Sequence, residues 1–215
     1  MTAPLIDTVI FDLGGVIMRN GGPRDFTRRY PEHDPSLVAE LVMGPHHLDT
    51  DHQWHRVERG EISLDECLAI TKRALDDAGI RATVPPKRPA SGGFAFELNH
   101  DMVSLVRDLR GAGRKVGILT NNVREFRQWW WPLMDFEAEF DVIVDSHEVG
   151  MRKPNPAIYH LTLERLGAQA SRAAFLDDLE ANVVAARALG LHGIHVGEDS
   201  TAAIAEARRV ALDIA

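Results

Sequence analysis

The stretch Asp7–Ile17, DTVIFDLGGVI, decides the fold of this 215-residue chain. Its apolar, β-branched residues stop abruptly at Asp12, and two glycines, Gly14 and Gly15, follow almost at once. A short run of this kind predicts a buried strand that delivers one carboxylate to its carboxyl-terminal end. Open α/β sheets build their binding sites at that edge.

The composition predicts one large globular domain, or a core domain with a smaller insert. Apolar residues make up 45% of the chain and charged residues 26%, which predicts a real hydrophobic core. The formal net charge of −8 argues against nucleic acid or an anionic membrane as a general partner, because both attract basic surfaces. The only cysteine, Cys67, cannot form an internal disulfide, and neither a signal peptide nor an apolar run of about 18 residues is visible. We therefore expect a cytoplasmic protein.

The chain changes character after Ile17. Residues 18–98 are rich in charge, histidine and proline and contain no convincing strand, so we predict an α-helical cap domain here. The core domain would then comprise residues 1–17 and 99–215. Within the cap, the sequence predicts helices at Arg24–Tyr30, Pro35–Met43, Asp51–Arg59 and Leu64–Ala78, and a return linker at Val84–Gly93.

Beyond Asp101, helix and strand patterns alternate regularly. Strands are predicted at Lys115–Thr120, Val142–Asp145, Ala173–Asp177 and Gly193–Val196, and helices at Asp101–Arg110, from about Val123, at Pro156–Leu166, at Leu179–Leu189 and from about Thr201. This alternation predicts an α/β fold with a doubly wound, Rossmann-like parallel sheet, right-handed crossovers and helices on both faces.

Polar residues stand at or just beyond four of the predicted strand ends. They are Asp12 after the first strand, Thr120 and Asn121 at the second, Lys153 in the loop beyond the third, and Asp177 and Asp178 at the fourth. Any one of them alone could be a turn former or a helix cap. Together they would converge on one crevice, because the carboxyl ends of parallel strands share an edge.

The chemistry of phosphate transfer accounts for this set. Neighbouring carboxylates repel one another, and a hard divalent cation, Mg²⁺, is the simplest compensation. With Mg²⁺ and Lys153 neutralising a phosphate dianion, Asp12 could attack phosphorus as a nucleophile and form an aspartyl-phosphate. Thr120 and Asn121 would hold the phosphoryl oxygens.

Four segments carry a resemblance to a known family: VIFDLGGVI, ILTNN, GMRKPNPAIY and FLDDLEANVVAARALG. The chain resembles the haloacid dehalogenase superfamily, in the class whose helical cap follows the first motif. The third and fourth segments are particularly similar to the amino-terminal phosphatase domain of soluble epoxide hydrolases and to bacterial sugar phosphatases. The resemblance implies a Mg²⁺-dependent phosphatase, monomeric or homodimeric, that acts on a small phosphorylated metabolite such as a sugar phosphate.

The resemblance also implies roles for individual residues. Asp12 would be the nucleophile and a metal ligand. The Gly14 carbonyl and Asp178 would be further metal ligands, and Asp177 would lie near the metal or reach it through a bridging water. Thr120 and Asn121 would bind the phosphate, and Lys153 would neutralise the nucleophile and the phosphate. Asn182, one helical turn beyond Asp178, would either orient the metal site through a hydrogen bond or lie at the surface.

One position departs from the family pattern. Phosphatases of this superfamily usually carry a second Asp two residues after the nucleophile, where it protonates the leaving alcohol, and here that residue is Gly14. Losing a positioned acid typically costs about 10²- to 10⁴-fold in rate. Another group, a bound water or a good leaving group could compensate. The alternative is a slow or non-catalytic phosphate-binding protein. A haloacid dehalogenase is less favoured, because acidic Asp177 and Asp178 would repel its anionic substrate.

The cap contains a histidine-rich run, residues 43–63. His46, His47, His52 and His55 cluster there with Asp49, Asp51 and Trp54. A solvated polar face, substrate contacts and a zinc site are the three interpretations, and zinc is the least favoured because the spacing matches no established ligand motif. Between the other two, we lean to His46, His47 and Trp54 closing over the substrate.

A second unusual run is Trp129–Trp131. Trp130 shares a helical stripe with Phe126, so we predict a core position for it. Pro132 predicts that the helix ends near Trp131, where an exposed aromatic side chain could mark a dimer surface, although ordinary packing is favoured.

Overall fold

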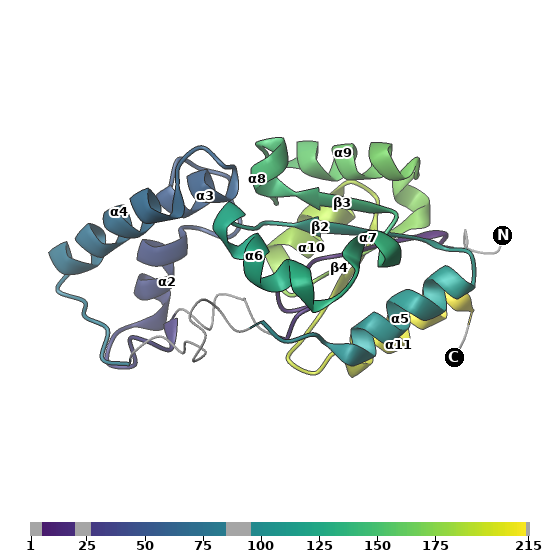
Figure 1. Cartoon of the computed structure of the whole chain (residues 1–215), viewed down its shortest axis with the longest axis horizontal. Coiled ribbons are helices and arrows are strands. Elements are labelled where there is room, and N and C mark those ends of the chain that lie inside the picture. Colours follow the sequence, from purple (N-terminus) through teal and green to yellow (C-terminus); the bar gives the residue numbers. More distant parts are fainter. Residues whose placement is uncertain (1–5, 20–26, 85–95, 214–215) are drawn as a thin grey trace.

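The computed structural model describes residues 6–19, 27–84 and 96–213 (Figure 1). Five parallel strands form one sheet in the order β3-β2-β1-β4-β5. The strands are β1 (Thr8–Phe11), β2 (Lys115–Thr120), β3 (Val142–Asp145), β4 (Ala173–Asp177) and β5 (His192–His195). The predicted doubly wound α/β fold is therefore confirmed. Within the described ranges, no helix combines the length and the apolar character that crossing a bilayer requires.

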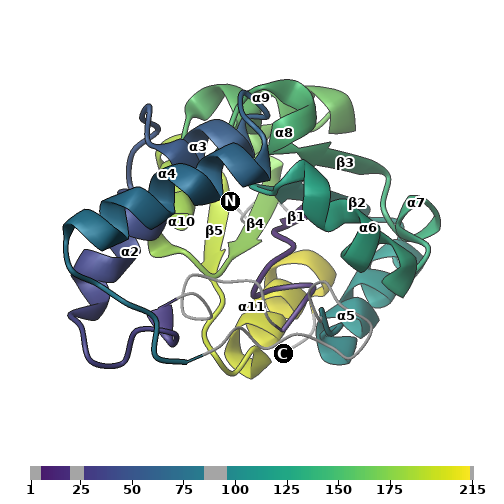
Figure 2. The same ribbon diagram turned by 60° about the vertical axis from the view of Figure 1, so that its left-hand side comes forward.

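Helices cover both faces of the sheet (Figures 1 and 2). Helices α5 (His100–Gly111) and α11 (Thr201–Leu212) pack on one face, and α9 (Pro156–Leu166) and α10 (Glu180–Ala188) pack on the other. Successive residues of β1 serve opposite faces: Val9 and Phe11 belong to the apolar cluster with α5 and α11, and Ile10 to the cluster with α9 and α10. This alternation follows from the two-residue period of a strand and explains why β1 is apolar throughout.

Side chains at the helix ends set these elements in place. The Asn155 side chain accepts a hydrogen bond from the Ala157 N–H at the start of α9, and Pro156 occupies the first turn. The same helix ends at Gly167, whose φ of +56° lies in the left-handed region. These signals explain why α9 has the bounds that the sequence predicts.

Three further helices lie together at one end of the sheet (Figure 1). They are α2 (Pro35–Met43), α3 (Gln53–Glu58) and α4 (Leu64–Asp77). Ser63 and Glu66 form a reciprocal capping box at the start of α4. The chain leaves the core and returns to it at adjacent points, since the Arg19 N–H donates to the Glu97 carbonyl and the Asn99 N–H to the Ile17 carbonyl, each at 2.8 Å. Residues 24–26 of the predicted helix at 24–30 lie outside the described residues, and in its described part only Thr27 is helical, while Arg28 and Arg29 form a turn. The predicted linker at 84–93 lies outside the described residues apart from Val84.

The single helix expected from about Val123 is wrong at its start, whereas its predicted end near Trp131 is confirmed. A 3₁₀ turn (Arg124–Phe126) precedes α6 (Arg127–Trp130), and a second 3₁₀ turn (Trp131–Leu133) follows it. Pro132 cannot donate a helical hydrogen bond, which accounts for the change at Trp131. Trp130 is fully buried, and Trp131 stacks on Phe136 with ring centroids 5.5 Å apart. The predicted core position of Trp130 is confirmed. Two short helices, α7 (Phe136–Glu139) and α8 (Ser146–Val149), flank β3.

Candidate active site

Asp12 directly follows β1 and is held in one orientation. Its backbone N–H donates to the Leu176 carbonyl at 2.8 Å, which extends the β1–β4 pairing by one residue. Its Oδ1 accepts a hydrogen bond from the Leu13 N–H at 2.7 Å and lies 2.9 Å from Lys153 Nζ. Among the described residues, no protein group contacts Oδ2 by a hydrogen bond. The carboxylate is therefore fixed through one oxygen, and the other remains available.

Lys153 lies between two carboxylates. Its Nζ contacts Asp12 Oδ1 at 2.9 Å and Asp177 Oδ2 at 2.6 Å, and it donates to the Leu119 carbonyl at 3.0 Å. The side chain is 1% exposed, and the two carboxylates raise the pKa of Lys153 despite its burial. The ammonium group therefore stays charged and partly neutralises Asp12.

Asn121 holds the loop that carries Lys153. Its Nδ2 donates to the Lys153 carbonyl at 3.0 Å, and its Oδ1 accepts from the Lys153 N–H at 2.8 Å. This pair of bonds ties the end of β2 to the loop beyond α8 and sets the position of the ammonium group. Asn121 thus has a structural task that the sequence did not indicate.

Asp177 is the most enclosed of the three site aspartates. It is fully buried and accepts hydrogen bonds from the Leu179 N–H at 2.8 Å and from Asn182 Nδ2 at 3.0 and 3.1 Å. The Tyr159 hydroxyl in turn donates to the Asn182 carbonyl at 3.0 Å. Asn182 therefore orients Asp177, and it is buried where one sequence interpretation placed it at the surface.

Asp12, Asp177 and Asp178 form a compact acidic cluster, with one ligand atom of each within 4.8 Å of the others. Burial raises the pKa of Asp12 to about 7 and that of Asp178 to about 8; the Asp177 charge adds to both shifts, and Lys153 opposes them. Gly15 lets the backbone approach this cluster, because a Cβ at its φ of +72° would lie 2.5 Å from Asp178 Oδ2. A set of hard oxygen donors that resists ionising together fits a hard divalent cation.

A cavity of about 60 Å³ lies at this edge of the sheet, between the core and the cap helices. The core residues that line it are Asp12, Gly14, Asn121, Arg152, Lys153, Asp178, Leu179 and Asn182, and the cap residues are Met43, His46, Trp54 and Glu58. The strand ends and the cap therefore enclose the acidic cluster jointly.

Two predicted contacts lie outside this lining. His47 is exposed, whereas its neighbour His46 lines the cavity together with Trp54. Thr120 is buried at the end of β2, in register with Asp145 of β3, and does not line the cavity. Asp12, Asn121, Lys153 and Asp178 are brought together there.

Two buried charged residues in the lining were not predicted from the sequence. Arg152 Nε donates to Glu58 Oε2 at 2.7 Å, across a sequence separation of 94 residues. No local spacing links two residues so far apart. Glu58 does stand four residues after Trp54 in α3, and the Trp54 indole N–H donates to its Oε1 at 2.9 Å.

The cap histidines have structural partners. His52 Nδ1 accepts a hydrogen bond from the Trp54 N–H and so caps α3, and the buried His55 accepts from the Thr50 N–H at 3.1 Å. Burial, with nearby Arg152 adding to it, lowers the pKa of His55 to about 3, so its ring is neutral. In the described part of the chain, the aspartate cluster is the only group of three or more His, Cys, Asp or Glu side chains that lie close enough to share a metal ion. The zinc interpretation of the histidine run thus gains no support.

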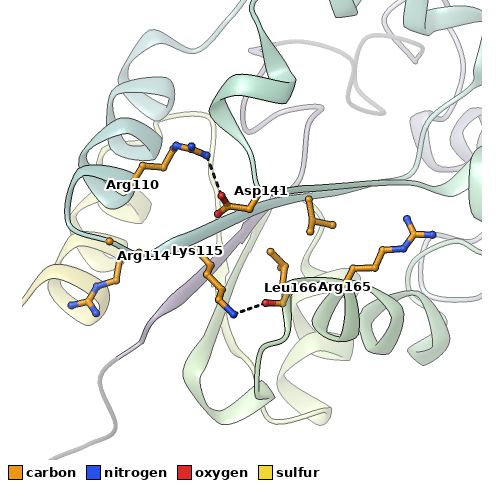
Figure 3. Close-up of a pocket in the computed structure, with 8 residues that line it drawn as sticks. Arg110, Arg114, Lys115, Asp141, Arg165 and Leu166 are labelled. Carbon is orange, nitrogen blue, oxygen red and sulfur yellow. Dashed lines mark hydrogen bonds and ion pairs between the residues drawn. The ribbon is translucent and has the colours of Figure 1, made fainter.

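A larger cavity of about 450 Å³ lies at the opposite edge, where β2 and β3 begin (Figure 3). Arg110, Arg114, Lys115 and Arg165 make its lining basic. Figure 3 shows Arg110 paired with Asp141, Lys115 bonded to the Leu166 carbonyl, and the Arg114 and Arg165 guanidinium groups directed away from each other. These cations do not converge on one point, so the cavity lacks the arrangement of a binding site.

Known proteins provide an independent comparison. The family of haloacid dehalogenase-like hydrolases matches residues 6–190. Acyl-CoA dehydrogenase family member 10 of Mus musculus is 30% identical over 203 residues, which cover 90% of this chain but 18% of that protein. The sesquiterpene phosphatase astK of Aspergillus oryzae is 33% identical over 208 residues, 94% of each chain.

Solved structures share the fold at lower identity. A haloacid dehalogenase family enzyme of Bacteroides thetaiotaomicron, in complex with magnesium and inorganic phosphate, matches with a TM-score of 0.62 and 20% identity, over 92% of this chain and 98% of that one. A dehalogenase with an intermediate complex matches with a TM-score of 0.65 and 16% identity, over 97% and 98%. The strand order, the acidic cluster at the strand ends and the family match agree, and the chain belongs to the haloacid dehalogenase-like hydrolases.

Proposed function

We propose that this protein is a Mg²⁺-dependent phosphatase that hydrolyses the phosphate monoester of a small metabolite, such as a sugar phosphate, through an aspartyl-phosphate on Asp12. The observation that carries the proposal is the buried Lys153 ammonium group, which lies 2.9 Å from Asp12 and 2.6 Å from Asp177. A cation in this place lowers the cost of bringing a phosphate dianion to an ionised nucleophile. The relative named as a sesquiterpene phosphatase supports the same reaction class.

We assign the cation to the Asp12 and Asp178 carboxylates and the Gly14 carbonyl, with Asp177 nearby. When bound, Mg²⁺ would supply positive charge to the phosphoryl oxygens. The donors are hard oxygens, as Mg²⁺ prefers, and both Asp12 and Gly14 line the cavity. Asp177 already accepts hydrogen bonds from Asn182 and Lys153, so its contribution is charge and orientation.

Asp12 attacks with Oδ2, while the Leu13 N–H and Lys153 Nζ hold Oδ1. In the first step the bond from Oδ2 to phosphorus forms and the bond to the leaving oxygen breaks. The leaving oxygen keeps the electron pair and takes a proton from a water molecule, and the hydroxide that remains is neutralised by the proton that the attacking water gives up in the second step. In the second step water attacks phosphorus and the bond to Oδ2 breaks. Inorganic phosphate leaves and the Asp12 carboxylate is restored.

The proton transfers need a group other than residue 14, since Gly14 has no side chain. His46 lines the cavity, and burial lowers its pKa, so its neutral imidazole is suited to accept a proton from the attacking water. Asn121 uses one amide N–H on the Lys153 carbonyl and keeps the other for a phosphoryl oxygen. Trp54 is proposed to contact the leaving group; His47 and Thr120 stay as predictions, because neither lines the cavity.

Partners and location follow from the same features. We expect one small phosphorylated metabolite as the ligand, and neither nucleic acid nor membrane, because the formal net charge is −8. Cys67 is a buried free thiol, which is compatible with a reducing compartment such as the cytoplasm.

Two other functions compete with this proposal. A haloacid dehalogenase also uses an Asp nucleophile, but it needs no cation, and the Asp177 and Asp178 carboxylates beside Asp12 would repel its carboxylate substrate. A slow phosphate-binding or regulatory protein would retain the cation site and lack efficient proton transfer. Gly14 is the feature that favours this alternative, because it has no side chain to carry a proton.

Phosphate release from a panel of metabolite phosphates tests the proposal. Wild type with Mg²⁺ should release phosphate from at least one ester, and Asp12→Asn should lose at least about 10³-fold of that activity, because an amide is a poor nucleophile. Chelating the cation with EDTA should abolish turnover of the wild type. If wild type releases no more phosphate than Asp12→Asn across the panel, the phosphatase proposal is wrong.

A control variant separates loss of chemistry from loss of fold. Asp34→Asn changes an exposed residue at the start of α2 and lies outside the cavity lining. It should keep the activity of wild type. Halide release from 2-chloropropionate, measured with the same preparations, should be absent, and its presence would favour the dehalogenase instead.

A further inference from the structure

Arg152 joins the core to the cap at the edge of the active-site cavity. Its side chain is 4% exposed, and its Nε donates to Glu58 Oε2 at 2.7 Å. Its Nη1 donates to the Leu48 carbonyl at 2.9 Å. One guanidinium group of the core thus contacts both α3 and the loop before it.

Glu58 is held from two sides. Its second oxygen, Oε1, accepts the Trp54 indole N–H at 2.9 Å, and the residue is buried. Arg152, Glu58 and Trp54 all line the cavity that Asp12 and Lys153 line. Hydrogen bonds therefore fix the position of the guanidinium group, and the buried Glu58 carboxylate balances its positive charge.

One end of this guanidinium group has no described protein partner. Nε and Nη1 are bonded, whereas Nη2 makes no hydrogen bond to any residue in the described ranges. Nη2 is not fully buried, so part of its surface is accessible. Arg152 lines the cavity beside the nucleophile and its side chain is otherwise enclosed, so the cavity is the open space within reach of Nη2.

We propose that Arg152 determines specificity, its Nη2 donating a hydrogen bond to a hydroxyl or carbonyl oxygen of the group that carries the phosphate. A neutral oxygen is the matching acceptor, because Glu58 already balances the Arg152 charge and the acidic cluster would repel a second anion. The substrate class is then a small hydroxylated alkyl phosphate. This inference rests on the proposed phosphatase function.

A matched pair of esters tests the proposal. Glycerol 3-phosphate and n-propyl phosphate have the same chain length and a similar alkoxide leaving group, and only the first carries hydroxyl groups. Wild type should favour glycerol 3-phosphate in kcat/KM. In Arg152→Met this preference should fall by about 10- to 100-fold, the effect of one hydrogen bond from a charged donor.

Two further variants distinguish recognition from cap attachment. Arg59 belongs to the same cap, where it pairs with Asp49 and donates to the Thr50 carbonyl at 2.9 Å, but it does not line the cavity. Arg59→Met should change kcat/KM for both esters by the same factor and leave the preference for glycerol 3-phosphate intact. Arg152→Lys keeps the charge with a shorter reach, and it should recover only part of the preference.

An equal loss of kcat/KM for both esters in Arg152→Met would overturn the proposal, because a residue that only attaches the cap affects the turnover of every substrate alike. Retention of the wild-type preference would also overturn it. Calorimetric binding of the two esters to Asp12→Asn, with and without Arg152→Met, gives the same comparison without turnover. A wild type that binds the esters selectively but does not hydrolyse them contradicts the phosphatase proposal and leaves the assignment of Arg152 standing.

Discussion

Replacing Lys153 by Met should destabilise the protein in a manner that a cation can reverse. The change removes the ammonium group 2.9 Å from Asp12 and 2.6 Å from Asp177 and leaves two buried carboxylates without a counter-charge. Removing one partner of a buried ion pair costs about 3 to 5 kcal/mol. Since domains are stable by only about 5 to 15 kcal/mol, the loss should be large in urea unfolding at pH 8 with EDTA present.

The same variant should regain stability in two ways. Mg²⁺ should stabilise Lys153→Met more than wild type, because the ion replaces the missing positive charge. Lowering the pH from 9 to 6 should also narrow the difference in stability, since Asp12 has a pKa of about 7 with Lys153 present and a higher pKa without it, and is therefore neutral in both proteins at pH 6.

Lys72→Met is the matched control. Lys72 pairs with Asp76 on an exposed face of α4, and removing it should cost less than about 1 kcal/mol. If Lys153→Met loses no more unfolding free energy than Lys72→Met in EDTA, the carboxylates at the site do not need the lysine as a counter-charge.

Three further predictions concern the metal, the proton donor and the cysteine. Mg²⁺ affinity should rise between pH 6 and pH 9, because Asp12 and Asp178, with pKa values of about 7 and 8, must lose protons before they bind the ion. The number of protons released on binding should fall over the same range. Calorimetry in buffers of different ionisation enthalpy counts these protons, and a count that does not change with pH would contradict the two pKa values. Gly14→Asp should raise turnover of alkyl phosphates, by up to about 10²-fold, more than that of nitrophenyl phosphate, since only the alkoxide needs a proton to leave; equal gains would show that this proton is not what wild type lacks. Burial raises the pKa of the Cys67 thiol to about 11. Cys67 should therefore react with an aromatic disulfide at pH 8 at least about 100-fold more slowly in the native protein than in urea, because less of the thiol is ionised. Comparable rates would mean that the thiol is accessible.

The sequence predicted the sheet well because its strands are buried on both faces. Strand β2 (Lys115–Thr120) and strand β3 (Val142–Asp145) have the predicted bounds, since each is an apolar run that ends at a polar residue. The segment after Val123 was predicted only in part: Pro132 indicated the end of the helix near Trp131, but the helical spacing did not indicate that Arg124–Phe126 forms a 3₁₀ turn.

The site was predictable only in part. Residues at strand ends, such as Asp12, meet because parallel strands share an edge, so their grouping follows from the topology. The pairing of Arg152 with Glu58 depends on how the cap folds back over the core, and nothing local to either residue indicates it. Asn121 shows the same limit, since its bonds to the Lys153 backbone arise from the path of a distant loop.

Asp12 should carry the phosphoryl group during turnover, and trapping this aspartyl-phosphate is the most direct test of the proposed function. Wild type, Mg²⁺ and a hydrolysed ester would be quenched in acid during turnover, and the peptides mapped by mass spectrometry. The peptide that contains Asp12 should gain the mass of one phosphoryl group, and this gain should be absent without Mg²⁺ and absent from Asp12→Asn. Turnover that persists in Asp12→Asn, or a phosphoryl group on a different residue, would contradict it.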